Sequence, residues 1–188
     1  HEEEPEWGYY GFSQARDRKK IVVVGGGPAG LQFASVAARK GHDVTIFERK
    51  DVLGGNILLA SKVDEGSEEL LRPIKTLERE CKRAGVHIQL GTECTGEMLV
   101  GQGADLIVIA QGARIKSVTG IQPERFYTPE EIIGKGTRPP RKIAIIGGNG
   151  VGLGVAVFLA RSGPYDLTII EESGKLGRDV NPFYLWRY

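Results

Sequence analysis

A glycine-rich turn near the N-terminus carries residues whose types and spacing could do chemistry. Residues 25–30 read GGGPAG directly after the apolar run 21–24, and they fit the pattern GxGxxG. The first glycine of this pattern permits a tight turn, and the second lets a pyrophosphate approach the backbone. The third lets a helix pack closely on a strand. Phosphates would then bind free N–H groups at the start of that helix, so the turn predicts a dinucleotide site.

An acidic residue follows at the spacing that such a site requires. Glu48 ends the next β-branched run, eighteen residues beyond Gly30. A carboxylate at that place can hold a ribose 2′-hydroxyl. The alternative is a tight strand–helix turn with an unrelated surface glutamate. Because the strand, turn, helix and acidic residue occur in order, we favour the dinucleotide site.

A second glycine-rich turn, GGNGVG at residues 147–152, follows another apolar run. Gly147 and Gly152 hold the first and third glycine places, whereas Asn149 holds the second. Asparagine tolerates positive φ, so the turn can form, but its side chain would crowd a pyrophosphate unless its amide donates a hydrogen bond. Glu171 ends the next run and would suit the 2′-hydroxyl of NADH rather than the 2′-phosphate of NADPH. Two interpretations stay open, an NAD(H) site and a relic turn kept for packing.

The elements around these turns predict an α/β fold. Apolar runs alternate with helical patterns, and each glycine turn joins a strand to a helix in a βαβ unit. We expect a three-layer Rossmann-like fold with two dinucleotide-binding βαβ units, the second incomplete because a unit of about fifty residues is too small to stand alone. The expected strands are 21–24, 44–48, 86–90, 106–110, 143–146 and 167–170; the expected helices are 29–40, 67–84, 129–133 and 150–161, with a loop at 53–61.

Composition narrows the classes of protein. The formal net charge is +1 and 40% of residues are hydrophobic, so we expect no nucleic-acid or membrane partner. The N-terminal residues lack the apolar core of a signal peptide, which predicts a cytoplasmic protein. Cys81 and Cys94 are spaced neither for zinc nor for a CxxC pair, and we expect two buried thiols and no metal site.

Three further motifs carry a family resemblance. GGGPAGL, GHDVTIFER and LGGN occur in this order within residues 25–56. Together they are similar to the FAD-binding region of two-dinucleotide-binding flavoproteins. Among these the chain most resembles the C-terminal region of the iron-sulfur flavoproteins related to old yellow enzyme. That group includes 2,4-dienoyl-CoA reductase, trimethylamine dehydrogenase and histamine dehydrogenase, and the likeness runs from about Glu2 to the C-terminus.

The resemblance implies the domains and the residues of the FAD site. Asn56 stands where the family has glutamine, and Gln111 stands where it has threonine. The implied domains are a connector at 1–20, an FAD-binding domain at 21–136 and a partial NAD(P)-binding domain at 137–188. The implied FAD site comprises Gly25, Gly27, Pro28, Ala29, Gly30, Glu48, Arg49, Gly54, Gly55, Asn56, Cys94, Ala110, Gln111 and Gly112. The NAD(H) site that the second turn predicts by its spacing comprises Gly147, Gly148, Asn149, Gly150, Gly152 and Glu171.

The resemblance also implies a function. Complete relatives relay electrons between NAD(P)H, FAD, a 4Fe-4S cluster and FMN, with the protein supplying position and electrostatics. Here the cluster and FMN are expected only in an N-terminal half that this sequence lacks, and that half is the predicted partner. The chain would then be part of an NADH:flavin oxidoreductase, with its catalytic residues unassigned. The alternative is a non-catalytic domain that holds ADP in the FAD position as a structural ligand.

The chain lacks the sequence signatures of two other classes of flavoprotein. A thiol-disulfide reductase would need a cysteine pair soon after the LGG loop, where the chain has ILLA at residues 57–60. A flavin amine oxidase would show an arginine after the paired glycines, where the chain has Asn56.

Overall fold

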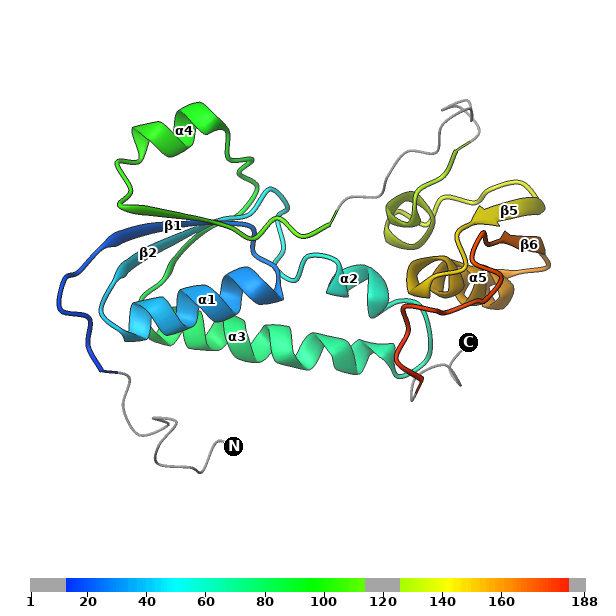
Figure 1. Cartoon of the computed structure of the whole chain (residues 1–188), viewed down its shortest axis with the longest axis horizontal. Helices are drawn as coiled ribbons and strands as arrows, with labels where there is room; N and C mark the ends of the chain where they lie inside the picture. The colour runs from blue at the N-terminus through cyan, green and yellow to red at the C-terminus, as the bar shows by residue number, and fades with distance from the viewer. Residues whose placement is uncertain (1–12, 114–125, 183–188) are drawn as a thin grey trace. The chain divides into compact units, whose positions relative to one another are not determined.

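The structure is a computed structural model that describes residues 13–113 and 126–182 (Figure 1). The chain divides into two compact units. The first contains the described residues up to Asn56 together with 71–113, and the second contains 57–70 and 126–182. This division differs from the predicted boundary at residue 136, because residues 57–70 and 126–136 join the second unit. Most of the predicted connector at 1–20 lies outside the described residues.

The first unit is built on a four-stranded parallel sheet in the order β3-β2-β1-β4. β1 and β2 pair in register from Lys20 with Asp43 to Val24 with Phe47. The central strand β1 is buried from Ile21 to Val24, as its continuous β-branched run predicts. The strands are β1 (Lys20–Val24), β2 (Asp43–Phe47), β3 (His87–Gln89) and β4 (Leu106–Ile109).

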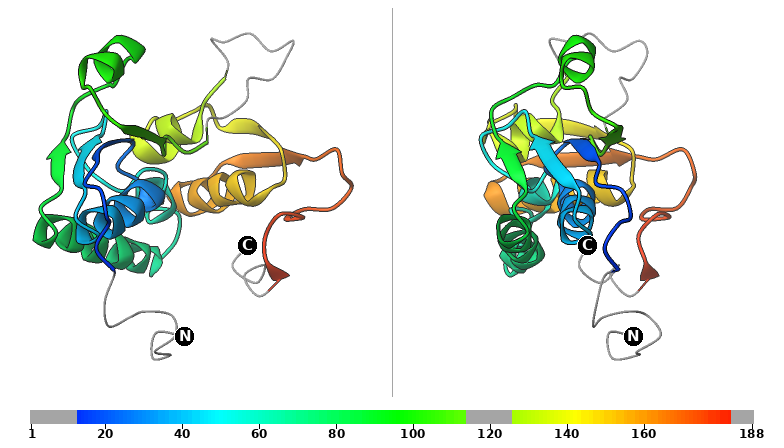
Figure 2. Two further views of the ribbon diagram at one scale, coloured as in Figure 1. Left: turned by 60° about the vertical axis from the view of Figure 1, so that its left-hand side comes forward. Right: turned by 90° about the vertical axis from the view of Figure 1, so that its left-hand side faces the viewer.

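Helices cover both faces of this sheet. α1 (Pro28–Arg39) and α3 (Leu71–Arg83) lie on one face, and α4 (Gly96–Gly101) lies on the other (Figures 1 and 2). Met98 and Leu99 of α4 pack against the cluster of Val22, Val24 and Phe47. The predicted three-layer α/β arrangement is therefore confirmed for this unit.

Two helical predictions need correction. The helix predicted for 67–84 is interrupted, because a 3-10 turn (η2, Ser67–Leu70) precedes α3. Pro73 explains the break: it has no N–H to bond to the residue four places earlier, so it is tolerated only in the first turn of a helix. The loop predicted for 53–61 contains the short helix α2 (Ile57–Ala60), and α4 was not predicted.

The second unit repeats the strand–turn–helix–strand order on a smaller scale. β5 (Lys142–Ile146) and β6 (Asp166–Ile170) form a two-stranded parallel sheet, and α5 (Gly150–Ser162) joins them. The predicted short helix at 129–133 is a π-helical turn, η4 (Glu130–Gly134), whose Ile132 and Ile133 pack with Leu159 of α5. Arg161 of α5 also forms an ion pair with Asp64. The predicted Rossmann-like fold with alternating βα units is confirmed.

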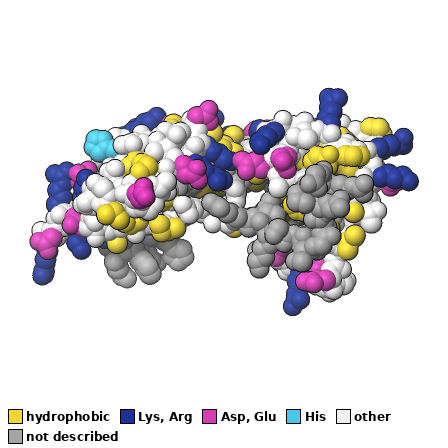
Figure 3. Space-filling model, turned by 90° about the horizontal axis from the view of Figure 1, so that it is seen from above, with side chains coloured by type: hydrophobic (Ala, Val, Ile, Leu, Met, Phe, Trp, Pro, Cys, Tyr) yellow, Lys and Arg dark blue, Asp and Glu magenta, His cyan; other side chains and the backbone are white. Residues whose placement is uncertain are grey.

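The surface carries charges of both signs. On the face shown in Figure 3, Lys and Arg side chains lie beside Asp and Glu side chains, in agreement with the formal net charge of +1. Within residues 13–113 and 126–182, no helix has the length and apolar character needed to cross a bilayer.

Candidate functional site

The first and third glycines of the first turn are required by its backbone geometry. Gly25 has φ 113° and its N–H donates to the carbonyl of Phe47 at 2.8 Å, which ties the turn to the end of β2. A Cβ on Gly25 would overlap the carbonyl oxygen of Ala110, and a Cβ on Gly30 would overlap the carbonyl oxygen of Gly25. These two glycines therefore have the tight-turn and close-packing roles that the pattern predicts.

The second glycine faces open space. Gly27 is the N-cap of α1, and no side chain caps this helix. A Cβ on Gly27 would meet its nearest neighbour, Gly55 Cα, only at 3.9 Å. Pro28 begins the helix without an N–H group, so the N–H groups of Ala29 and Gly30 are the donors that the helix end presents. An uncapped helix N-terminus beside an open glycine fits a pyrophosphate.

Glu48 lies at the end of β2 and is only 6% exposed. Its Oε2 accepts a hydrogen bond from the N–H of Gly26 at 2.7 Å, and its Oε1 accepts one from the N–H of Lys50 at 2.9 Å. The carboxylate is therefore fixed beside the turn and is not an unrelated surface residue. Each oxygen has a further lone pair, so the carboxylate can also accept hydrogen bonds from ribose hydroxyls.

The LGG loop closes onto the same turn. Gly54 donates its N–H to the carbonyl of Gly26 at 2.9 Å, and the side chain of the buried Leu53 takes the space that a Cβ on Gly26 would need. Gly54 and Gly55 take φ values of 126° and 56°, which favour glycine. A loop far along the chain thus lines the open side of the first turn.

Of the remaining predicted FAD-site residues, Ala110 lies beside this turn. The N–H of Ala110 donates to the carbonyl of Val24 at 2.8 Å, which places the end of β4 beside the glycines. Arg49, Asn56, Gln111 and Gly112 are exposed, and Gly112 has φ 71°. The structure therefore brings together the turn, Glu48, the LGG loop and Ala110, whereas those four residues lie on the surface.

The two thiols are weak nucleophiles. Cys81 is buried and donates to the carbonyl of Leu31 at 3.3 Å. Burial, and then the charge of Glu80, raise the pKa of Cys81 to about 11. Cys94 is half-buried against the Val22 cluster, and burial raises its pKa as well. Both thiols are therefore protonated at neutral pH, and only Cys81 matches the expectation of full burial.

The second turn repeats the carboxylate arrangement of the first. Glu171 follows β6, and its Oε2 accepts a hydrogen bond from the N–H of Gly148 at 2.6 Å. Its Oε1 accepts one from the N–H of Ser173 at 2.9 Å. Hydrogen bonds from Ser173 and then from Gly148 lower the pKa of Glu171. Glu171 therefore relates to the second turn as Glu48 relates to the first.

The second turn also repeats the backbone contacts of the first. Gly147 has φ 101° and donates to the carbonyl of Ile170 at 2.8 Å, and a Cβ on Gly152 would overlap the carbonyl oxygen of Gly147. Gly177 donates its N–H to the carbonyl of Gly148 at 2.7 Å, as Gly54 does in the first unit. The second strand–turn–helix unit is thus a structural copy of the first.

Asn149 is where the two turns differ. It has φ −79° and ψ 178°, so the expected use of positive φ is wrong; the positive φ of this turn belongs to Gly147. The oxygen of the Asn149 side chain is turned back onto the helix, which leaves the amide NH2 group as its remaining donor. Its Oδ1 accepts from the N–H groups of Val151 at 3.1 Å and Gly152 at 3.0 Å, and so caps α5. Gly150 donates its N–H to Asp179 Oδ1 at 2.9 Å.

Sequence reasoning missed Leu176, Gly177 and Asp179. A signal was present, because Leu176 and Gly177 follow Glu171 at the spacing at which Leu53 and Gly54 follow Glu48. Counting on at that spacing places Asp179 opposite Asn56. The dipeptide LG is too short to predict a role from sequence alone. Its role is shown by the hydrogen bond from the N–H of Gly177 to the carbonyl of Gly148.

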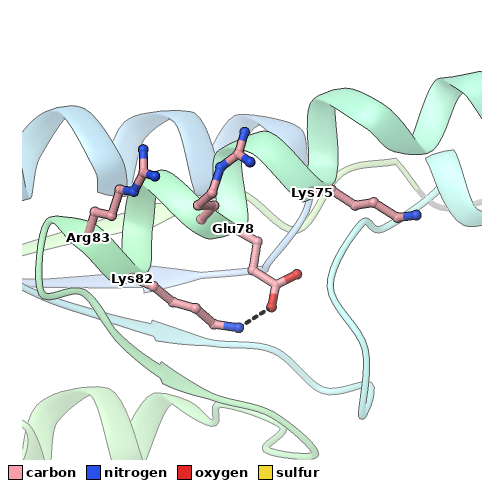
Figure 4. A pocket seen from close by; sticks show the side chains of 5 residues that line it. Lys75, Glu78, Lys82 and Arg83 are labelled. Atoms are coloured by element: carbon pink, nitrogen blue, oxygen red, sulfur yellow. Dashed lines mark hydrogen bonds and ion pairs between the residues drawn. The ribbon is translucent and has the colours of Figure 1, made fainter.

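A hollow on the first unit lies on a different surface. It is lined by residues of one face of α3, namely Lys75, Glu78, Arg79, Lys82 and Arg83 (Figure 4). Glu78 and Lys82 point toward each other and form an ion pair at 2.6 Å. This is the solvated face of an amphipathic helix and includes none of the predicted site residues. In the described parts of the chain, no three His, Cys, Asp or Glu residues are grouped to hold a metal ion.

Two dinucleotide-type turns in series are the arrangement of a known family. The family model described as pyridine nucleotide-disulphide oxidoreductase matches residues 19–184. The chain belongs to the pyridine nucleotide-disulphide oxidoreductase family. Membership implies a fold that binds FAD and NAD-type dinucleotides. Since the match covers both turns, the second unit is included in this assignment.

Individual relatives of the chain refine the comparison. The chain is 34% identical over 180 residues to an NADH oxidase of Thermoanaerobacter brockii, covering 93% of this chain and 27% of that protein. A 2-naphthoyl-CoA reductase structure superposes with a TM-score of 0.86 at 29% identity, over 97% of this chain and 28% of that one. Histamine dehydrogenase from Rhizobium sp. 4-9 shares the fold, with a TM-score of 0.69 at 20% identity over 88% of this chain and 26% of that one.

These matches confirm the predicted resemblance to the FAD/NAD(P)-binding region of the old yellow enzyme-related flavoproteins. The chain spans about a quarter of the length of the relatives it matches, such as 27% of the NADH oxidase and 28% of the 2-naphthoyl-CoA reductase. It therefore resembles the dinucleotide-binding region of flavin-dependent, NAD(P)H-linked oxidoreductases.

Proposed function

We propose that the first unit binds FAD and the second binds NAD(H), as part of an NADH:flavin oxidoreductase. The observation that carries this proposal is the first turn, where an uncapped helix end and an open Gly27 stand beside a buried carboxylate. FAD would supply hydride acceptance and single-electron release. The chain's own groups would hold it: the N–H groups of Ala29 and Gly30 for the pyrophosphate, Glu48 for the ribose, and the LGG loop along the phosphates.

The proposed relay needs a second half. The FMN and the 4Fe-4S cluster would lie in an N-terminal half of the parent protein, which would discriminate among substrates. The names of relatives, an NADH oxidase and a 2-naphthoyl-CoA reductase, support a reductase that takes electrons from NADH. Glu171 supports NADH over NADPH, because its carboxylate would repel a 2′-phosphate.

A second candidate is a structural domain that holds ADP in place of FAD. The capped second turn favours it, because Asn149 already occupies donors that a nicotinamide dinucleotide would use. In this candidate the first turn keeps its nucleotide for stability, and no electrons pass through the chain.

One experiment separates the two candidates. The purified chain is denatured, the released nucleotide is identified by mass, and the visible spectrum is recorded before denaturation. FAD with flavin absorbance supports the relay, whereas ADP without flavin supports the structural domain. A chain that releases no nucleotide and binds neither added FAD nor added ADP contradicts both.

A matched variant tests the site itself. Gly27→Asn reproduces in the first turn the residue that Asn149 provides in the second. Gly27 has an ordinary φ of −80° and open space around it, so the variant folds and gains a helix cap. We expect its melting temperature without ligand to be unchanged or higher and its nucleotide content to fall at least about tenfold, since its side chain would fill the phosphate position. Full nucleotide content in Gly27→Asn would show that the turn does not hold the phosphates.

A further inference from the structure

All three N–H groups that begin α5 have acceptors from the chain itself. Val151 and Gly152 donate to Asn149 Oδ1, and Gly150 donates to Asp179 Oδ1 at 2.9 Å. In a glycine turn of this kind these are the groups that a dinucleotide pyrophosphate would use. The second turn is therefore already filled by oxygen atoms of the protein.

The first turn offers a direct comparison within the same chain. Gly27 has no side chain to cap α1, and Pro28 has no N–H where Gly150 has one. The residue that follows the carboxylate by eight positions is Asn56 in the first unit and Asp179 in the second. Asn56 is neutral, whereas Asp179 brings a negative charge to the place where phosphate charge would bind.

We propose that Asp179 is an internal competitor whose carboxylate, bonded to the N–H of Gly150, lowers the affinity of the second turn for a dinucleotide. This inference rests on the proposed function of that turn as an NAD(H) site. One N–H group cannot serve a carboxylate and a phosphate at once, and the two negative charges repel each other. Asp179 thus sets the affinity of the second turn for any pyrophosphate-containing ligand.

The position of Asp179 allows this displacement. Asp179 is exposed and lies outside the helices and strands, in the segment between β6 and the end of the described chain. Its side chain can move into water without exposing a buried group. Asn149 differs, because its neutral amide caps the helix through two bonds within three residues. Asp179 is therefore the charged group of the two, and it is the more easily displaced.

Replacing Asp179 tests the inference on the whole 188-residue chain with NADH as the probe. Asp179→Ala removes the acceptor and the charge, and Asp179→Asn removes the charge alone. We expect NADH affinity, measured by calorimetry, to rise about tenfold or more in Asp179→Ala and about threefold in Asp179→Asn, as for a charged hydrogen bond on an exposed group. The gap between wild type and Asp179→Asn narrows at high salt, because screening weakens the repulsion.

A matched control separates this local effect from a change in net charge. Asp166 is also exposed but begins β6, at the other end of the strand from the second turn. Asp166→Ala makes the same change in net charge and is expected to leave NADH affinity unchanged. Circular dichroism confirms that each variant is folded.

Three outcomes overturn the inference. The first is that Asp179→Ala binds NADH no better than wild type. The second is that Asp166→Ala raises the affinity as much as Asp179→Ala does. The third is that neither wild type nor any variant binds NADH. Equal, measurable binding by wild type and Asp179→Ala overturns the inference but supports the NAD(H) site. The nucleotide released from the first turn is identified in the same samples, so failure of the inference is distinguished from failure of the proposed FAD site.

Discussion

Replacing Glu48 with glutamine tests whether one carboxylate holds the first turn together. Both carboxylate oxygens accept backbone bonds, from Gly26 at 2.7 Å and from Lys50 at 2.9 Å, and the residue is only 6% exposed. A glutamine has one carbonyl oxygen and can accept only one of these bonds, while its amide group would face the other N–H. Losing one charged hydrogen bond in a buried position costs about 1.5–3 kcal/mol. Glu48→Ala loses both bonds. Because Lys50 is partly exposed, we expect the free energy of unfolding of Glu48→Ala to fall by roughly 2–4 kcal/mol in total.

The assay has two readouts. Urea unfolding followed by circular dichroism gives the free energy of unfolding, and the released nucleotide measures occupancy of the first turn. We expect Glu48→Gln to lose both stability and bound nucleotide. Glu171→Gln is the matched control, since Glu171 makes the same pair of bonds at 2.6 Å and 2.9 Å in the second unit. It is expected to leave the nucleotide content of the first turn unchanged.

A clear result would refute this reasoning. An ordinary surface substitution changes the free energy of unfolding by about 0.5 kcal/mol. If Glu48→Gln changes it by no more than that, the hydrogen bonds of Glu48 do not support the turn. If the nucleotide content also stays at the wild-type level, Glu48 has no part in holding the ligand. Loss of nucleotide at unchanged stability would instead assign Glu48 to the ligand alone.

Three further predictions follow from the same structure. Gly30→Ala places a methyl group on a backbone carbonyl and is expected to cost more than about 2 kcal/mol in urea unfolding, whereas Gly27→Ala stays within about 1 kcal/mol; similar losses in both would contradict the geometry. With a thiol reagent at pH 8, Cys94 is expected to react well before Cys81, whose pKa of about 11 keeps it protonated; mass spectrometry of labelled peptides decides, and equal rates would be inconsistent with its burial. Hydrogen bonds from the backbone and the side chain of Thr128 lower the pKa of Glu131. Glu131 therefore stabilises the fold above pH 4.5, the ordinary value for this carboxyl group, and this stabilisation is lost as the pH falls below 4.5. Unfolding at pH 7 and pH 4 should show a smaller difference in Glu131→Ala than in wild type, and an unchanged difference would exclude this role.

The sequence predicted the elements whose signals are local. The run from Ile21 to Val24 predicted a buried strand, and GGGPAG predicted the turn and helix that follow it. The break before α3 was missed, although Pro73 signals it, because the apolar spacing continues across the break. Two domains were predicted, but the place of residues 57–70 in the second unit was not, since it depends on contacts distant in sequence.

The sequence by itself determined that this protein has two strand–turn–helix units, each with a carboxylate after the next strand. Glycine spacing and β-branched runs act through backbone sterics within a few residues, so they can be read without a fold. Only the tertiary structure decided that Asp179 adds a negative charge to the second turn while the first turn stays open. The bond between Gly150 and Asp179 joins residues 29 positions apart. Its formation depends on how the chain returns to the turn, which no local pattern specifies.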